Sequence, residues 1–314
     1  MTSRRDRAIV VSALKHAVPY IRLFKGKVFV IKVGGEVFAD PELASALIEQ
    51  VGILHQVGIR TVLIHGGGPQ STKLATDLGL DTQFVEGRRV TDSESLNVAT
   101  MILNGQINTR ILATCRDLQI PAVGISGVDA GLIRAHRRPP VQGKDGESVD
   151  YGFVGDIDSV EADILQKQLD NGLMPVVSPL SCDESGTLLN INADTVAAAI
   201  AAELDAEKLI LVTGATGILE DVDDPGSLIS YIDRKHLRKL KKKGILADGM
   251  LPKAAAIDAA IRDGVSRVHV ISYKLPDSIL LEVFTNEGTG TLVVDDIAAL
   301  TPEELTPEEE GSGS

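Results

Sequence analysis

The sequence predicts an α/β protein with three layers around a mainly parallel β-sheet. Apolar runs bounded by glycine alternate with segments of helical pattern, which is typical of a parallel sheet covered by helices on both faces. The length of 314 residues allows one large domain or two lobes. The runs expected to form strands are Val28–Val33, Thr61–His65, Ile120–Ser126, Met174–Ser178, Leu209–Thr213 and Arg267–Ser272.

The expected helices start at residues that favour helix N-termini. Proline in the first turn, or Ser, Asp or Asn just before it, marks several of these starts. An additional apolar helix, Ala8–Phe24, precedes the first strand, and two Gly-, Pro- and Asp-rich segments, Leu132–Ile157 and Ser181–Asn190, are expected to form hairpins that close over a ligand. The other expected helices are Pro41–Val57, Pro69–Leu78, Ser93–Asp117, Val160–Asn171, Ala193–Leu204, Pro252–Arg262 and Pro276–Phe284.

Charge and composition exclude several classes of protein. The formal net charge of −13 argues against general nucleic-acid binding, because phosphate contacts need a basic surface. We expect no membrane span and no signal peptide, and therefore a cytoplasmic protein in which Cys115 and Cys182 stay reduced. The basic run Arg234–Lys243 is expected to be a solvated helix face. The acidic segment 298–314 is expected to be a disordered tail.

Two glycine clusters follow successive predicted strands. Lys32 lies near the end of the first strand, ahead of Gly34 and Gly35, and a lysine at the end of a strand buried on both faces is costly unless it meets an anion. The second strand ends in His65-Gly-Gly-Gly-Pro69, where exposed N–H groups and a helix N-terminus form an anion cradle. Each cluster alone also fits a tight turn, but the two together favour an anion site.

Two further charged residues stand at predicted helix starts. Asp194 follows Asn190-Ile-Asn-Ala, where Asn192 also fits an N-cap and Asp194 a first-turn acid. Lys253 places a positive charge at a helix N-terminus, where it opposes the helix dipole. A bound anion explains a cation in this position better than folding does. Two lysines, two glycine loops and one carboxylate are the parts that phosphoryl transfer needs.

The ordered set of motifs resembles the N-acetylglutamate kinases of the amino-acid kinase family. It runs in family order from about Pro19 to Val294. The resemblance implies the amino-acid kinase fold and ATP-dependent phosphorylation of the side-chain carboxylate of N-acetyl-L-glutamate, in arginine biosynthesis. The motifs are Lys32-Val-Gly-Gly35, His65-Gly-Gly-Gly-Pro69, Gly87-Arg-Arg-Val-Thr91, Ser126-Gly-Val-Asp129, Gly152-Phe-Val-Gly155, Asn190-Ile-Asn-Ala-Asp194 and Gly249-Met-Leu-Pro-Lys253.

The resemblance also implies roles for individual residues. Lys32 and Lys253 would stabilise the transferring phosphoryl group, and Asp194 would orient both lysines. An amino-acid-binding lobe would span 26–179 and a nucleotide-binding lobe 180–297. Mg²⁺ would arrive with ATP, held by phosphate oxygens and not by a separate protein site. The residues expected to bind the amino acid are Gly34, Gly35, Gly67, Gly68, Arg89, Asn190 and Asn192. Those expected to bind the nucleotide are Lys32, Gly34, Gly35, Thr213, Gly217 and Lys253.

The N-terminal segment 1–25 is similar to the helix of the arginine-sensitive acetylglutamate kinases, which interlaces dimers into hexamers. Its apolar stripe fits such an interface, although it also fits a helix packed back on its own domain. The resemblance therefore implies a homo-oligomer, expected to be a hexamer, with L-arginine as a feedback inhibitor. The residues expected to bind arginine are Tyr20, His269, Glu282, Gly288 and Gly290.

Three positions depart from the family pattern. Val33 and Val128 stand where the family has an aromatic residue and a lysine, and Gly214 stands where an aspartate follows the strand of the nucleotide lobe. Two alternatives therefore stay open. One is a kinase for carrier-linked aminoadipate or glutamate, and the other is a weakened kinase domain that binds an effector and regulates a partner.

Overall fold

The computed structural model describes residues 4–300, apart from 86–87, 144–145, 222, 225, 247 and 287. Gly87 of the third motif and the part of the expected acidic tail beyond residue 300 lie outside the described residues. In the described part of the chain, no helix is both long and apolar enough to cross a membrane.

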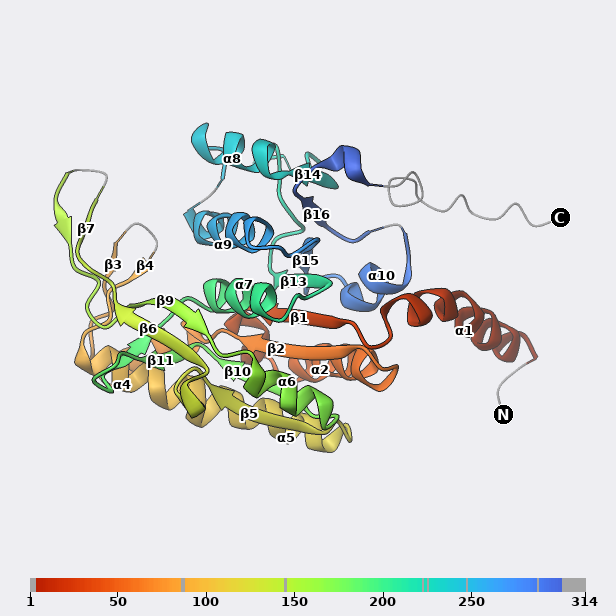
Figure 1. Cartoon of the computed structure of the whole chain (residues 1–314), viewed down its shortest axis with the longest axis horizontal. Coiled ribbons are helices and arrows are strands. Elements are labelled where there is room, and N and C mark those ends of the chain that lie inside the picture. Colours follow the sequence, from red (N-terminus) through yellow and green to blue (C-terminus); the bar gives the residue numbers. More distant parts are fainter. Residues whose placement is uncertain are drawn as a thin grey trace.

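A large, mainly parallel sheet lies at the centre of the molecule (Figure 1). Within the described residues its strand order is β14-β16-β15-β13-β1-β2-β10-β5, and among its pairs only β15 with β16 is antiparallel. This confirms the predicted fold class. The strands are β1 (Val28–Val33), β2 (Arg60–His65), β5 (Ala122–Ser126), β10 (Met174–Ser178), β13 (Lys208–Thr213), β14 (Tyr231–Asp233), β15 (Val268–Ser272) and β16 (Thr291–Val294).

Helices cover both faces of this sheet. Alternate residues of β1 point to opposite faces, so Val28 and Val30 belong to one core cluster while Phe29 and Ile31 belong to the other. The first cluster includes residues of α6 (Asp163–Asp170), α7 (Ala193–Glu203), α8 (Arg234–Lys242) and α9 (Leu251–Arg262). The second includes residues of α2 (Pro41–Gln56), α3 (Gly68–Asp77), α4 (Ser93–Thr100), α5 (Thr109–Asp117) and α10 (Ser278–Phe284).

Two expected helices differ in detail. The stretch predicted as one helix over Ser93–Asp117 contains a π-helix, η2 (Met101–Asn108), between α4 and α5. Helix α6 begins at Asp163 and not at Val160, because Val160 is the last residue of strand β9. The apolar period of a helix does not reveal the wider π turn. Only Glu161 and Ala162 separate β9 from α6, which is too short a break to show where the strand ends and the helix begins.

Hairpins project from one end of the sheet, opposite the N-terminal helix (Figure 1). Both predicted hairpins are present and share a small sheet of order β12-β11-β6-β9. A third hairpin, β3–β4, was not expected. The strands are β3 (Phe84–Val85), β4 (Arg88–Arg89), β6 (Ile133–Arg137), β7 (Val141–Gln142), β8 (Ser148–Val149), β9 (Gly155–Val160), β11 (Leu180–Cys182) and β12 (Leu188–Asn190).

The predicted N-terminal helix is α1 (Arg4–Phe24), which extends away from the sheet (Figure 1). Its last turn packs on the domain, because Phe24 is buried and meets Phe29 edge-on with ring centres 5.2 Å apart. Its outer part is different: Val10, Val11 and Leu14 are each more than half exposed. The stripe is therefore divided between a packed end and an exposed apolar end.

Candidate active site

Lys32, Asp194 and Lys253 meet at the carboxyl end of strand β1. Lys32 lies near the end of β1, Asp194 in the first turn of α7 and Lys253 in the first turn of α9. Lys32 Nζ lies 2.9 Å from Asp194 Oδ1, and Lys253 Nζ lies 3.1 Å from each Asp194 carboxylate oxygen. The residues are 8%, 7% and 7% exposed, in chain order. We call them the Lys–Asp–Lys group.

The electrostatics of this group favour a bound anion. Burial would raise the pKa of Asp194, but the two ammonium groups outweigh burial and lower it to about 2. Burial lowers the pKa of Lys253, and the charge of Lys32 lowers it further. With both lysines protonated, the group carries one net positive charge in a place where water is scarce. An anion placed beside it gains more than it would in bulk solvent.

The two glycine clusters contact each other next to this group. A Cβ atom on Gly35 would lie only 2.9 Å from Gly67 Cα, and a Cβ atom on Gly67 would lie 2.7 Å from Leu103 Cδ2. A side chain at Gly35 would therefore separate the two turns, and one at Gly67 would push its turn away from Leu103 of the π-helix η2. Helix α3 begins at Gly68, and Pro69 has no N–H, so the N–H groups of Gly68 and Gln70 lack acceptors within the helix and are available to an anion.

The Lys–Asp–Lys group and both glycine turns border one cavity of about 240 Å³, which we call the glycine-loop cavity. Lys32 and Asp194 line it directly, whereas Lys253 lies behind Asp194, to which it is bound. Every residue expected to bind the amino acid also lines this cavity: Gly34, Gly35, Gly67, Gly68, Arg89, Asn190 and Asn192. The structure therefore brings the predicted set together, while the roles of its members remain predictions.

Arg89 and the two asparagines already have partners. Arg89 Nη2 donates to Thr72 Oγ1 at 2.6 Å and to the Gly68 carbonyl at 3.2 Å. Burial lowers the pKa of Arg89, yet a guanidinium stays protonated at neutral pH. Asn192 is the N-cap of α7, since its Oδ1 accepts from Asp194 N at 2.8 Å. Asn190 Nδ2 donates to Thr91 Oγ1 at 3.4 Å, just after the β3–β4 hairpin.

The remaining nucleotide-site predictions, Thr213 and Gly217, lie outside the glycine-loop cavity. Thr213 is still near it, because β13 pairs in parallel with β1 and Val212 is the neighbour of Val33. At Gly214, an added Cβ would lie 3.1 Å from Tyr273 Oη. A tyrosine therefore lies next to the position where the family pattern has an aspartate.

Comparison with known proteins identifies the family. The profile of the amino acid kinase family matches residues 27–272. The chain belongs to the amino acid kinase family.

Within this family, the chain is similar to acetylglutamate kinases. The enzyme of Myxococcus xanthus is 45% identical over 288 residues, covering 90% of this chain and 94% of that protein. The enzyme of Symbiobacterium thermophilum is 43% identical and covers 92% of this chain and 98% of its own length.

Solved structures of the N-acetylglutamate synthase from Neisseria gonorrhoeae are also similar. The complex with coenzyme A and N-acetyl-glutamate has a TM-score of 0.79 at 29% identity, and the complex with coenzyme A and L-arginine has a TM-score of 0.78 at 28% identity. Each similarity covers 91% of this chain, which spans 63% of the length of the synthase in the first complex and 65% in the second.

Sequence reasoning missed some of the residues that line the glycine-loop cavity of this family member. Glu36 follows the first glycine pair, and its carboxylate folds back to within 2.2 Å of the position that a Gly34 Cβ would take. Leu103 and Ser71 also line the cavity. The signal for Glu36 was an acid directly after the Gly-Gly pair. Nothing local marks Leu103, which reaches the cavity from the π-helix.

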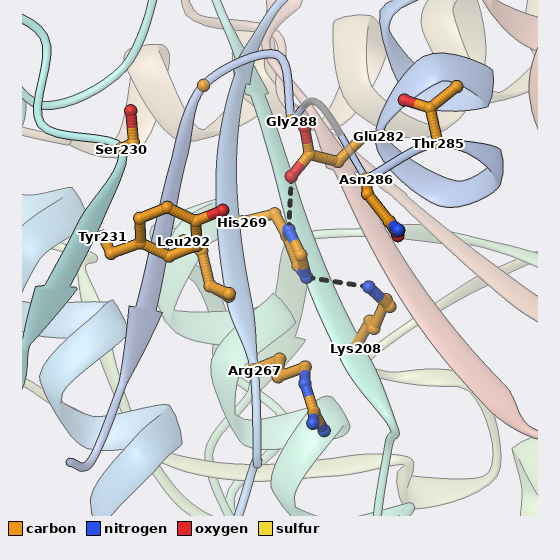
Figure 2. Close-up of a pocket in the computed structure, with 11 residues that line it drawn as sticks. Lys208, Ser230, Tyr231, Arg267, His269, Glu282, Thr285, Asn286, Gly288 and Leu292 are labelled. Carbon is orange, nitrogen blue, oxygen red and sulfur yellow. Dashed lines mark hydrogen bonds and ion pairs between the residues drawn. The ribbon is translucent and has the colours of Figure 1, made fainter. Parts of the chain in front are cut away.

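A second cavity of about 110 Å³, the His269 cavity, contains a row of buried titratable groups (Figure 2). His269 Nδ1 lies 2.6 Å from Glu282 Oε1, and His269 Nε2 lies 3.2 Å from Lys208 Nζ. Thr289 donates to Glu282 Oε2 from its backbone N–H at 2.5 Å and from its hydroxyl at 2.9 Å.

The charges in the His269 cavity have a consistent assignment. Burial lowers the pKa of His269, and the nearby charge of Lys208 lowers it further, so the imidazole is neutral. Burial would raise the pKa of Glu282, but the hydrogen bonds from His269 and Thr289 outweigh it and hold the pKa below its usual value. The Glu282 carboxylate therefore stays ionised inside the cavity.

Four of the five residues expected to bind arginine line this cavity: His269, Glu282, Gly288 and Gly290. The fifth, Tyr20 of α1, lies beside it and donates a hydrogen bond of 2.9 Å to Asn286 Oδ1, which belongs to the lining. The loop residue 287 lies outside the described residues.

Proposed function

We propose that this chain transfers the γ-phosphoryl group of ATP to the side-chain carboxylate of N-acetyl-L-glutamate. The observation that carries the proposal is the Lys–Asp–Lys group beside two glycine turns, with both ammonium groups held by one carboxylate. Acetylglutamate kinases that are 43–45% identical over about nine tenths of the chain support the same reaction.

The chemistry needs charge stabilisation and orientation, and it needs no protein base. A side-chain carboxylate is already deprotonated at neutral pH, so its oxygen can attack the γ-phosphorus directly. A bond forms between that oxygen and phosphorus while the bond to the β-phosphate oxygen breaks, giving an acyl phosphate and ADP. Lys32 and Lys253 would stabilise the charge on the transferring group, and the glycine amides would donate to its oxygens. Asp194, bound to both ammonium groups, would fix their positions.

The two lobes would divide the substrates between them. Residues 26–179 would hold the amino acid, with Arg89 binding its α-carboxylate, and residues 180–297 would hold ATP. Asn190, from the start of the second lobe, would lie beside the amino acid. Arg89 would exchange its bond to Thr72 for a bidentate pair with the substrate. Mg²⁺ would enter with ATP and be bound mainly by phosphate oxygens.

Trapping the acyl phosphate with hydroxylamine tests the proposal. Purified protein is incubated with ATP, Mg²⁺ and either N-acetyl-L-glutamate, L-glutamate or L-2-aminoadipate, and the hydroxamate and ADP are measured. We expect hydroxamate to form fastest with N-acetyl-L-glutamate, in step with ADP. Equal or faster turnover of either free amino acid would contradict the assigned substrate.

We propose that L-arginine binds in the His269 cavity and inhibits the enzyme. The support is the ionised Glu282 in that cavity, which matches a guanidinium, and the loop at Gly288 and Gly290, which can offer backbone groups. Glu282 would exchange one of its present bonds for the ligand (Figure 2). The similar N-acetylglutamate synthase complex with L-arginine adds support.

We also propose that α1 joins copies of the chain into a hexamer in the cytoplasm. The exposed apolar side chains of Val10, Val11 and Leu14 support a partner surface on the outer half of the helix. Tyr20, in the packed half, touches the edge of the His269 cavity through Asn286. Arginine would then favour an oligomer geometry in which the two lobes stay apart, through tighter binding to that state.

A further inference from the structure

His65 is a buried histidine that the phosphoryl-transfer chemistry does not use. It is the last residue of β2 and directly precedes the turn of Gly66, Gly67 and Gly68, and its exposed fraction is 0%. Its ring also meets Phe38 edge-on, with ring centres 6.2 Å apart. Phe38 belongs to the short helix η1 (Gly35–Ala39) that follows the other glycine turn. The imidazole therefore lies between the turn that follows its own strand and the helix that follows the other glycine turn.

The neighbours of His65 define its tautomer. Asn108 Nδ2 lies 2.9 Å from the Val176 carbonyl and 3.2 Å from His65 Nε2. An amide nitrogen only donates, so His65 Nε2 must be the acceptor and the ring proton must be on Nδ1. Nδ1 lies 3.1 Å from the Gly66 carbonyl, to which it then donates. Burial lowers the pKa of His65 to about 4, so the ring is neutral at physiological pH.

The π-helix η2 supplies the partner of His65. In a π-helix the backbone bonds join residues five apart, so side chains four apart lie near the same side. Asn104 and Asn108 form one such row: Asn104 accepts a hydrogen bond from Ser178, and Asn108 binds Val176 and His65. Leu103 and Ile107 form the next row, and both pack against Gly67.

The backbone of Gly66 is thus held at both its N–H and its carbonyl. Its N–H donates to the Val33 carbonyl at 2.9 Å, and its carbonyl accepts from His65. A run of three glycines has the least conformational restriction of any sequence, so such anchors decide where the next amides point. Those next amides, of Gly67 and Gly68, border the glycine-loop cavity.

We infer that His65 is a positioning residue for phosphoryl transfer, locked by Asn108 of the π-helix in the Nδ1–H form so that it orients the Gly67 and Gly68 amides. The inference rests on the proposed kinase function for its kinetic consequence, while the tautomer itself does not depend on activity. A small displacement of preorganised donors lowers rates steeply, so a defect in this lock should appear mainly in kcat.

The first test replaces the partner and leaves the histidine in place. Asn108→Leu is similar in size and removes both amide donors. We expect kcat to fall on the order of 10- to 100-fold, with a much smaller change in KM for ATP and N-acetyl-L-glutamate. The control is Gln50→Met, which removes another buried amide, one that accepts from Ile279 N at 3.1 Å between α2 and α10. Equal kcat in Asn108→Leu and Gln50→Met would overturn the inference.

A second pair of variants tests the same inference if Asn108→Leu does not fold. In His65→Asn the amide nitrogen can take the place of Nδ1 and still donate to the Gly66 carbonyl, whereas His65→Leu has no donor. We expect His65→Asn to retain at least about tenfold more kcat than His65→Leu. Equal kcat in two folded variants would mean that the donor is not used, and would overturn the inference.

The third test reads the tautomer directly. In protein labelled with ¹⁵N-histidine, assigned by loss of the signal in His65→Asn, we expect a protonated Nδ1 and an unprotonated Nε2 that persist from neutral pH down to about pH 5. A ring protonated on Nε2 would overturn the inference. If the wild type failed to phosphorylate N-acetyl-L-glutamate but showed the Nδ1–H form, the proposed function would fail and the assigned lock would stand.

Discussion

Lys253 Nζ lies 3.1 Å from each carboxylate oxygen of Asp194, and both residues are 7% exposed. Lys32 binds the same carboxylate at 2.9 Å from another side of the site. One acid thus holds two cations that would otherwise repel each other. Together the two lysines and Asp194 carry one net positive charge beside the glycine-loop cavity, whose lining also holds Arg89 and Glu36. This charge suits a phosphoryl group that gains charge in the transition state.

Asp194→Asn keeps the shape of the side chain and removes its charge. We expect kcat to fall about 10²- to 10³-fold, because both lysines lose their shared anchor. We also expect a loss of about 3–5 kcal/mol in the free energy of unfolding, because two buried cations remain without a counter-charge. Steady-state kinetics and urea unfolding measure the two effects. Wild-type kcat in the folded variant would remove Asp194 from the mechanism.

The same variant should change the response to acid. A carboxyl group whose pKa is lower in the folded chain than in the unfolded chain stabilises the fold at pH values above the unfolded-state pKa. This stabilisation is lost as the pH falls through the folded-state pKa. The pKa of Asp194 is lowered from 3.8 to about 2. Between about pH 4 and about pH 2 the wild type should therefore lose on the order of 2 kcal/mol that Asp194→Asn does not lose. Parallel unfolding curves across this range would contradict the assignment.

Arg89→Lys should weaken substrate binding more than it slows the reaction. A lysine keeps the charge but cannot form the bidentate pair with an α-carboxylate, so KM for N-acetyl-L-glutamate should rise roughly tenfold with little change in kcat. The matched control is Arg88→Lys, at the exposed neighbouring position of the same strand. An unchanged KM in Arg89→Lys would exclude Arg89 as the clamp.

Much of this site could be predicted because its signals are local. The strands β1, β2, β10 and β13 are continuous apolar runs, and the turns after β1 and β2 carry glycines that few other structures require. Strands β14 and β16 were missed because they have only three and four residues, which is too short for a clear apolar pattern. Strand β14 lies at the sheet edge, and β16 lies between β14 and β15.

Contacts between distant residues could not be predicted in this way. Tyr20 and Asn286 are 266 positions apart, and Asn108 reaches His65 only because a π-helix turns it toward the strand ends. Such pairs depend on how complete elements pack, and the residue pattern of either segment alone carries no trace of them. The chemistry at Lys32 was visible in the sequence, whereas the supports around it were not.

Glu282→Gln should abolish the proposed response to arginine and preserve catalysis. The amide cannot form the ionic pair with a guanidinium, so millimolar L-arginine that inhibits the wild type should leave this variant active. Glu184→Gln, at an exposed turn, serves as the control and should stay inhibited. Activity is measured across an arginine titration. If arginine inhibits Glu282→Gln as it does the wild type, its binding site lies elsewhere.

Leu14→Glu should weaken the proposed assembly through α1. A charge in the exposed apolar stripe opposes burial against another copy, so the mass measured by light scattering should fall below that of the wild-type oligomer. Lys15→Glu changes charge at the next, exposed position and should leave the mass unchanged. A wild-type mass in Leu14→Glu, or a monomeric wild type, would contradict the assigned interface.

The most direct measurement follows the oxygen that joins carbon and phosphorus. N-acetyl-L-glutamate labelled with ¹⁸O in its side-chain carboxylate is incubated with ATP, Mg²⁺ and the enzyme, and the product is observed by ³¹P NMR. Attack by the carboxylate predicts an acyl-phosphate signal with an ¹⁸O isotope shift, because the bridging oxygen comes from the substrate. An acyl-phosphate signal without that shift, or formation of ADP and inorganic phosphate without any acyl phosphate, would contradict phosphoryl transfer to the side-chain carboxylate.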